Sequence, residues 1–144
     1  MKEFDNYEIE ENKMEESKVA FETAKLAKEK GFNEPSTHVY TIGFNSIKKD
    51  KIVRKFGNYE NNDKLLQPII LSKRQIHLAL APTQSLLQRW LREIHDIYVF
   101  IDHSSHHVMH YEVLTDDDHI IGLNTHSYEE ALESGLLRAL KLIK

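Results

Sequence analysis

The sequence predicts an α+β fold, an antiparallel sheet with amphipathic helices packed on one face. Apolar residues recur at helical spacing in three separate stretches, and short runs that favour strands lie between them. Polar turns, rather than helical crossovers, join these runs, and strands joined in this way pair antiparallel. The expected order of elements is therefore α-β-β-(β)-α-β-β-(β)-α.

The stretch from Ala81 to Asp102 is expected to be the central packing unit. Its helical part, residues 83–95, places a set of apolar side chains on one face: Leu86, Leu87, Trp90, Leu91 and Ile94. Such a stripe must pack on something, so Trp90 is expected in the core. Residues 97–101 follow as a run of β-branched and aromatic residues, typical of a strand with both faces covered.

Two further helices frame the chain. The first is expected from Glu16 or Ser17 to Lys30, because Gly31 can take the left-handed conformation that ends a helix. The last, residues 127–143, begins at a Ser-x-x-Glu capping box, in which the serine accepts a hydrogen bond from the third helical amide. The other runs are expected to be strands or extended segments: 37–44, 52–56, 68–71, 76–80, 108–114 and 119–123.

The length and charge of the chain predict one domain with an acidic leader. A chain of 144 residues, 40% apolar, can bury a core of its own. Residues 1–16 carry seven acids and two lysines, so this leader is expected to be a disordered tail or a segment that docks on a partner. Residues 17–144 then form the α+β domain, nearly neutral with 17 basic and 16 acidic residues.

Composition excludes several classes of chemistry. The absence of cysteine excludes disulfides, thiolate zinc sites and cysteine nucleophiles, and it suits a reducing cytoplasm. No apolar run approaches the ~20 residues of a spanning helix, so neither a signal peptide nor a membrane segment is expected. The nearly neutral domain lacks the basic field that a duplex requires, which disfavours nucleic-acid binding.

Three blocks of the sequence carry a family resemblance: AKLAKEKGF, APTQSLLQRWLREIHDIYVFI and SYEEALESGLLRALKLI. They resemble a family of small proteins encoded in Bacteroidota phages and mobile elements. The resemblance implies a host-cell cytoplasm as the location, and a setting in which small accessory proteins bind and neutralise host factors. It brings no catalytic residue with it.

Four histidines lie within eight residues: His103, His106, His107 and His110. Asp102 stands beside them, and His119 is near in the chain. A hairpin here would allow two or three imidazoles to reach one divalent metal ion, because neutral imidazole is a common zinc ligand. An exposed polar turn is the simpler interpretation, since the helix-borne HExxH pattern is missing. A metal-dependent hydrolase on this turn remains an alternative function.

The polar face of the central helix is the predicted ligand site, formed by Gln88, Arg89 and Arg92. Guanidinium forks bind phosphate bidentately. We therefore expect a non-enzymatic binding protein without a cofactor, which captures a small anionic, nucleotide-like host signal as a counter-defence factor. A homo-oligomer would enclose the ligand at its seam. The alternative is a protein-interaction module that inhibits a host enzyme.

Overall fold

The computed structural model describes residues 16–43, 51–59, 75–105, 108–122 and 125–144. The helices and strands of these described residues are consistent with the predicted order, and the α+β class is confirmed. In chain order they are α2 (Phe21–Glu29), β1 (Ser36–Gly43), β2 (Lys51–Tyr59), β3 (Gln75–Leu80), α3 (Gln84–His95), β4 (Tyr98–Ser105), β5 (Val108–Leu114), β6 (His119–Ile121) and α4 (Tyr128–Leu142).

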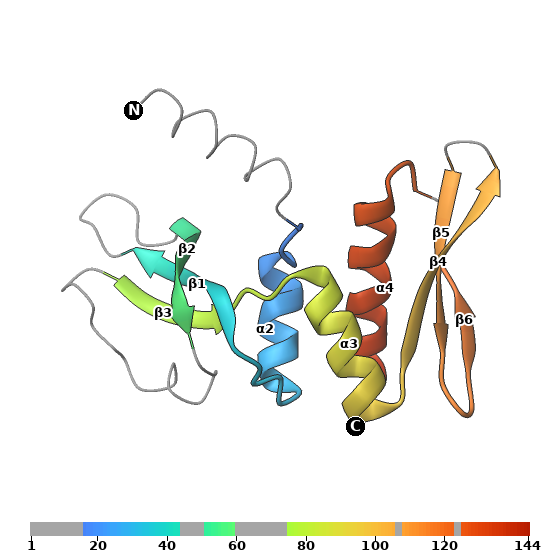
Figure 1. Ribbon diagram of the computed structural model, residues 1–144, viewed down its shortest axis with the longest axis horizontal. Helices are drawn as coiled ribbons and strands as arrows, with labels where there is room; N and C mark the ends of the chain where they lie inside the picture. Colours follow the sequence, from blue (N-terminus) through green and yellow to red (C-terminus); the bar gives the residue numbers. More distant parts are fainter. Residues whose placement is uncertain (1–15, 44–50, 60–74, 106–107, 123–124) are drawn as a thin grey trace, which may run out of the picture.

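The described strands form two antiparallel sheets, where the sequence suggested one. Their orders are β2-β1-β3 and β4-β5-β6. In Figure 1 the three labelled helices lie between the two sheets, with β1–β3 on one side and β4–β6 on the other. Helix α3 follows β3 in the chain and connects the first sheet to the second. The three strands before α3 pair with one another, and so do the three strands after it.

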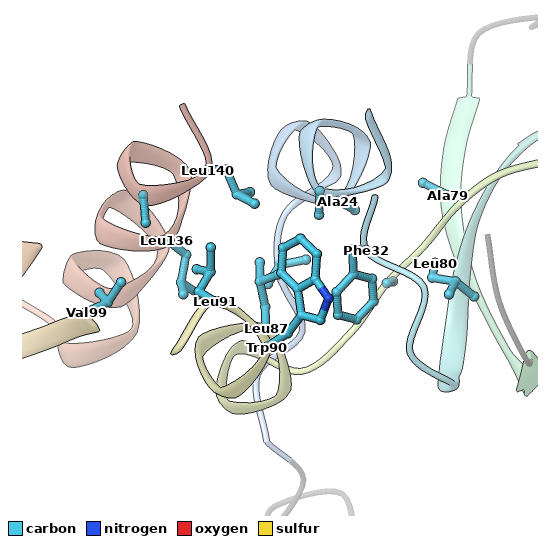
Figure 2. Close-up of a cluster of buried hydrophobic side chains, with 14 of the residues drawn as sticks. Ala24, Phe32, Ala79, Leu80, Leu87, Trp90, Leu91, Val99, Leu136 and Leu140 are labelled. Atoms are coloured by element: carbon cyan, nitrogen blue, oxygen red, sulfur yellow. The ribbon is translucent and has the colours of Figure 1, made fainter. Parts of the chain in front are cut away.

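Helix α3 lies at the centre of the core. Trp90 is 6% exposed and packs edge-to-face against Phe32, with ring centroids 5.4 Å apart (Figure 2). Leu87 and Leu91 are fully buried beside it, which confirms the predicted stripe. The prediction for Ile94 is wrong, because its side chain is 61% exposed. Its angular position on the helix matches the stripe, so helical periodicity alone does not predict this exposure.

Helix α4 packs against the second sheet at a glycine. Helix α4 contacts β4 and β5, whose residues Val99 and Val113 are buried. A Cβ atom at Gly135 would lie 2.8 Å from Val99 Cγ1 and 2.9 Å from Tyr111 Cβ. A glycine within a helix costs about 1 kcal/mol relative to alanine. The close approach of α4 to the sheet gives this glycine its structural reason.

Helix α2 begins later than the sequence suggested. The predicted start was Glu16 or Ser17, but the first helical residue is Phe21. The preceding backbone pairs with another segment instead: the Val19 amide donates to the carbonyl of Pro82 at 2.9 Å. A long-range partner therefore replaces the first predicted helical turn.

A carboxylate from α4 accepts hydrogen bonds from the start of α2. The Ala20 amide donates to Glu133 Oε2 at 3.0 Å, and the Thr23 hydroxyl donates to the same oxygen. The other oxygen, Oε1, accepts from Gln84 Nε2 at 3.1 Å. Glu133 thus ties the first turns of α2 and α3 to α4, and it supplies the cap that Ala20 lacks.

Four other expectations concern the cap of α4, the turn after Ile101 and two segments of the chain. The predicted cap of α4 is confirmed, since Ser127 Oγ accepts from the Glu130 amide at 3.0 Å. The polar turn expected after Ile101 is mostly strand, because β4 continues to Ser105 and pairs with β5. The predicted segment 68–71 and the acidic leader before Glu16 lie outside the described residues. None of the described helices has the length and apolar character needed to cross a membrane.

Candidate functional site

The three residues of the predicted anion site have different roles. Gln88 Nε2 donates to the Val99 carbonyl at 2.7 Å, so its amide joins α3 to β4. Arg89 and Arg92 are exposed, and Arg89 Nε lies 3.9 Å from Glu93 Oε2 one turn along the helix. An exposed pair at this distance contributes little to stability. The two guanidinium groups thus lie exposed on the surface of α3, whereas the Gln88 side chain is engaged in a hydrogen bond to β4.

The hollows beside α3 and α4 are acidic. A hollow of about 250 Å³ is lined by Gln88 together with Glu16 and Glu129, and it includes neither arginine. A larger open groove of about 640 Å³ combines one lysine with three carboxylates, those of Glu129, Glu130 and Glu133. Their negative potential makes these hollows poor sites for an anion.

The predicted metal residues are only partly brought together. His106 and His107 lie outside the described residues. His110 pairs across the strands with Asp102, whereas His103 pairs with Met109. Because neighbouring residues of a strand point to opposite faces, Asp102 and His103 project in opposite directions. The side chain of His110 therefore lies on the same face of the sheet as that of Asp102, and His103 lies on the opposite face.

We call the face of β4-β5-β6 that is turned away from α4 the outer face. It carries exposed apolar side chains together with carboxylates and imidazoles. Its residues alternate with the buried Val99 and Val113, and the strand pairing sets them in rows. One row is Tyr98, Leu114 and His119, the next is Phe100, Glu112 and Ile121, and the last is Asp102 and His110.

Two of these rows contain an apolar patch. Phe100 is 46% exposed and Ile121 is 61% exposed, with Tyr98 and Leu114 also exposed. The rings of Tyr98 and Phe100 stack with centroids 6.4 Å apart. Single exposed hydrophobic residues are ordinary, but a contiguous set on one face marks a contact surface.

Glu112 lies at the centre of the outer face, between two imidazoles. His119 Nε2 is 2.7 Å from Glu112 Oε1, and His110 Nε2 is 3.4 Å from Glu112 Oε2. The side chains of His110 and Glu112 are only 14% and 21% exposed. One ligand atom each of Asp102, His110 and Glu112 lies within 4.8 Å of the other two. Sequence reasoning missed Glu112, although its alternation with His110 along β5 was a usable signal.

The outer face belongs to an acidic region. Residues 93–137 contain ten acids and no lysine or arginine, while residues 17–92 contain six acids and 14 lysines and arginines. The acidic stretch spans the end of α3, the second sheet and the first two thirds of α4. Charge counted over the whole domain is nearly neutral and conceals this division, which a count by segment reveals.

Comparisons of the chain with protein-family models, with curated proteins and with solved structures find no match. The site itself therefore carries the functional argument. It consists of an exposed apolar sheet face with a carboxylate–imidazole cluster among its rows, in an acidic region.

Proposed function

We propose that this protein is a non-enzymatic binding protein that docks on another protein through the outer face. The observation that carries the proposal is the apolar patch of Tyr98, Phe100, Leu114 and Ile121 on one side of a sheet whose other side packs on α4. Apolar patches surrounded by polar residues are the mark of protein contact sites.

Charge favours a partner whose apolar surface is surrounded by lysine and arginine. Three exposed aspartates, 116–118, form the turn that follows Leu114, and Asp96 precedes the strand that carries Tyr98. The strands themselves offer no lysine or arginine to balance them. A second copy of the same face would bring like charges together, which costs affinity. We therefore expect a basic partner protein rather than a homodimer through this surface.

The family resemblance favours a host protein as that partner. Small phage and mobile-element proteins bind host factors in the host-cell cytoplasm, and a sheet face of this kind suits inhibition by surface contact. Docking would cover an active or assembly surface of the host factor without chemistry by this protein.

Affinity capture with matched variants tests the proposal. The parent, a Phe100→Ser/Ile121→Ser variant and an Ile94→Ser control are used as baits in a bacterial lysate. Ile94 is as exposed as Ile121, but it lies on α3 rather than on the outer face. We expect the parent and the control to retain one basic protein at equal stoichiometry and the double variant to lose it. Because the contact is partly electrostatic, salt should weaken it.

Thermal denaturation of each bait establishes that the double variant remains folded. Retention of the same protein by the folded double variant would contradict the proposal. So would a parent that captures nothing at stoichiometric level. A parent that is dimeric by light scattering, and monomeric after the double substitution, would assign the outer face to a second copy instead.

Capture of a small anionic ligand by α3 is the second candidate. It is supported by Arg92, which is exposed and has no carboxylate within ion-pair distance among the described residues, and by Arg89 three positions before it. Calorimetry of the parent with signalling nucleotides should then give heat, and the Arg89→Glu/Arg92→Glu variant should give none. Absence of heat with the parent would reject this candidate and leave the docking proposal untouched.

A further inference from the structure

We propose that Asp102, His110 and Glu112 form a binding site for a divalent transition-metal ion, with zinc as the metal of choice. The site lies on the outer face, where β4 and β5 bring the three side chains together. It is independent of the docking proposal, because its ligands are defined by their own geometry.

The spacing of the ligand atoms fits a tetrahedral ion. Two atoms bound to zinc at about 2.1 Å lie about 3.4 Å apart in tetrahedral geometry. His110 Nε2 and Glu112 Oε2 are separated by 3.4 Å. This separation is long for a hydrogen bond between nitrogen and oxygen. One carboxylate oxygen of Asp102 lies within 4.8 Å of one ligand atom each of His110 and Glu112, so a small movement of the exposed Asp102 side chain would complete the set.

His119 holds the carboxylate in a binding orientation. Its Nε2 is 2.7 Å from Glu112 Oε1, which leaves Oε2 directed to His110. Carboxylates that bind metal ions are themselves hydrogen-bonded, and such outer partners fix their orientation. His119 is therefore a positioning residue, and the three ligands leave a fourth position for water or a partner's side chain.

The surroundings supply the electrostatic reason for a cation. Asp102 and Glu112 bring two carboxylates to adjacent rows of the sheet, and Glu112 is largely shielded between Phe100 and Ile121. None of residues 93–137 is a lysine or arginine, so the sheet provides no permanent positive charge for them. Two carboxylates this close repel each other, and a divalent ion between them would offset that repulsion.

The ligand types select the metal. Calcium and magnesium prefer sites made wholly of oxygen atoms, whereas an imidazole nitrogen favours zinc and its neighbours in the first transition row. One imidazole with two carboxylates thus points to zinc rather than to calcium. The absence of cysteine keeps the site outside the thiolate class of structural zinc sites.

Zinc titration of the chelator-washed, untagged protein tests the site. Calorimetry should show one zinc ion per chain. His110→Ala should weaken binding by more than about tenfold, and His119→Ala should weaken it by less, in keeping with its outer role. Glu112→Gln removes the charge but keeps the size, and it should also weaken binding. Imidazole nitrogen resonances observed by NMR should report zinc at Nε2 of His110.

His103→Ala is the matched control, because it removes an exposed histidine from the same hairpin on the opposite face. It should bind zinc as the parent does. Absence of saturable binding by the parent would overturn the proposal. So would unchanged affinity in folded His110→Ala, or loss of binding in His103→Ala, which would assign the ion to other histidines of the hairpin.

Discussion

Among the described residues the two sheets have the same number of strands and the same antiparallel pairing, yet they meet the helices differently. The second sheet packs face-on against α4, where Val99 and Tyr111 lie close to the backbone of Gly135. The first sheet is attached near the start of α2, where the Tyr40 hydroxyl donates to the carbonyl of Val19 at 2.7 Å. Figure 1 shows the two sheets on opposite sides of the helices.

This difference explains where a binding surface arises. A sheet that packs face-on buries one set of alternating residues and presents the other set outward. In β4-β5-β6 the outward set includes Tyr98, Phe100 and Ile121, and no described helix covers them. The acidic character of residues 93–137 then distinguishes this half of the molecule from the basic residues 17–92.

Trp90→Ala is expected to have the largest effect, because it removes the centre of the helical layer that both sheets share. The lost packing should cost about 3–5 kcal/mol of the free energy of unfolding. Chemical denaturation measures this loss, and both sheets should lose hydrogen-exchange protection together. Ile94→Ala, on the same helix but 61% exposed, is the control and should change little. A Trp90→Ala protein that melts within a degree or two of the parent would show that the shared layer is not the core.

Gly135→Val should loosen the second sheet selectively. The new side chain would overlap Val99 and Tyr111, and overpacking of this kind costs about 1–3 kcal/mol. Hydrogen exchange should then show β4 and β5 opening at lower free energy than β1 and β3. The control is Ser134→Val, the same new side chain at the exposed neighbouring position. Equal effects of both substitutions would mean that helix propensity, rather than the contact with the sheet, explains the loss.

Tyr40→Phe should weaken the first sheet by about 1–2 kcal/mol. The change leaves the ring in place against Phe21 but removes the buried hydrogen bond to Val19, whose carbonyl then loses a partner. Amide exchange in β1 should rise while that in β4 and β5 is unchanged. Tyr128→Phe removes a hydroxyl from an exposed ring and serves as the reference. Faster exchange in both sheets would contradict their separate attachment.

The smallest expected effect is a pH dependence from His95, at the end of α3. Its ring packs edge-to-face on that of Trp90, with ring centroids 4.6 Å apart. The Nε2 atom of His95 is buried without a hydrogen-bond partner among the described residues. Burial lowers the pKa of His95 below the usual 6.5. The unfolded chain therefore binds this proton more readily, so stability should fall as the pH drops below about 6.5.

His95→Phe keeps a ring against Trp90 and removes the titration. Denaturation of the parent and this variant between pH 8 and pH 5 should show that their difference in stability changes with pH in the expected sense. A parent that loses no more stability than the variant on acidification would contradict this role for His95.

The sequence by itself determined the local elements and their order. The apolar stripe predicted helix α3, and Ser127 predicted the start of α4. Both signals are local, because they involve residues only a few positions apart in the chain. The strands followed from runs rich in β-branched and aromatic residues. The charge division between residues 17–92 and 93–137 is also present in the sequence alone.

Only the tertiary structure decided which distant residues meet. It divided the described strands between two sheets, placed Glu133 at the start of α2 and left Ile94 exposed. It also joined His110 to Glu112 and Asp102, where the sequence pattern had favoured the neighbouring histidines. Strand register and the packing of helices on sheets depend on contacts far apart in the chain. Local periodicity carries no information on such pairs, so the outer face and its metal-ligand cluster emerged only with the fold.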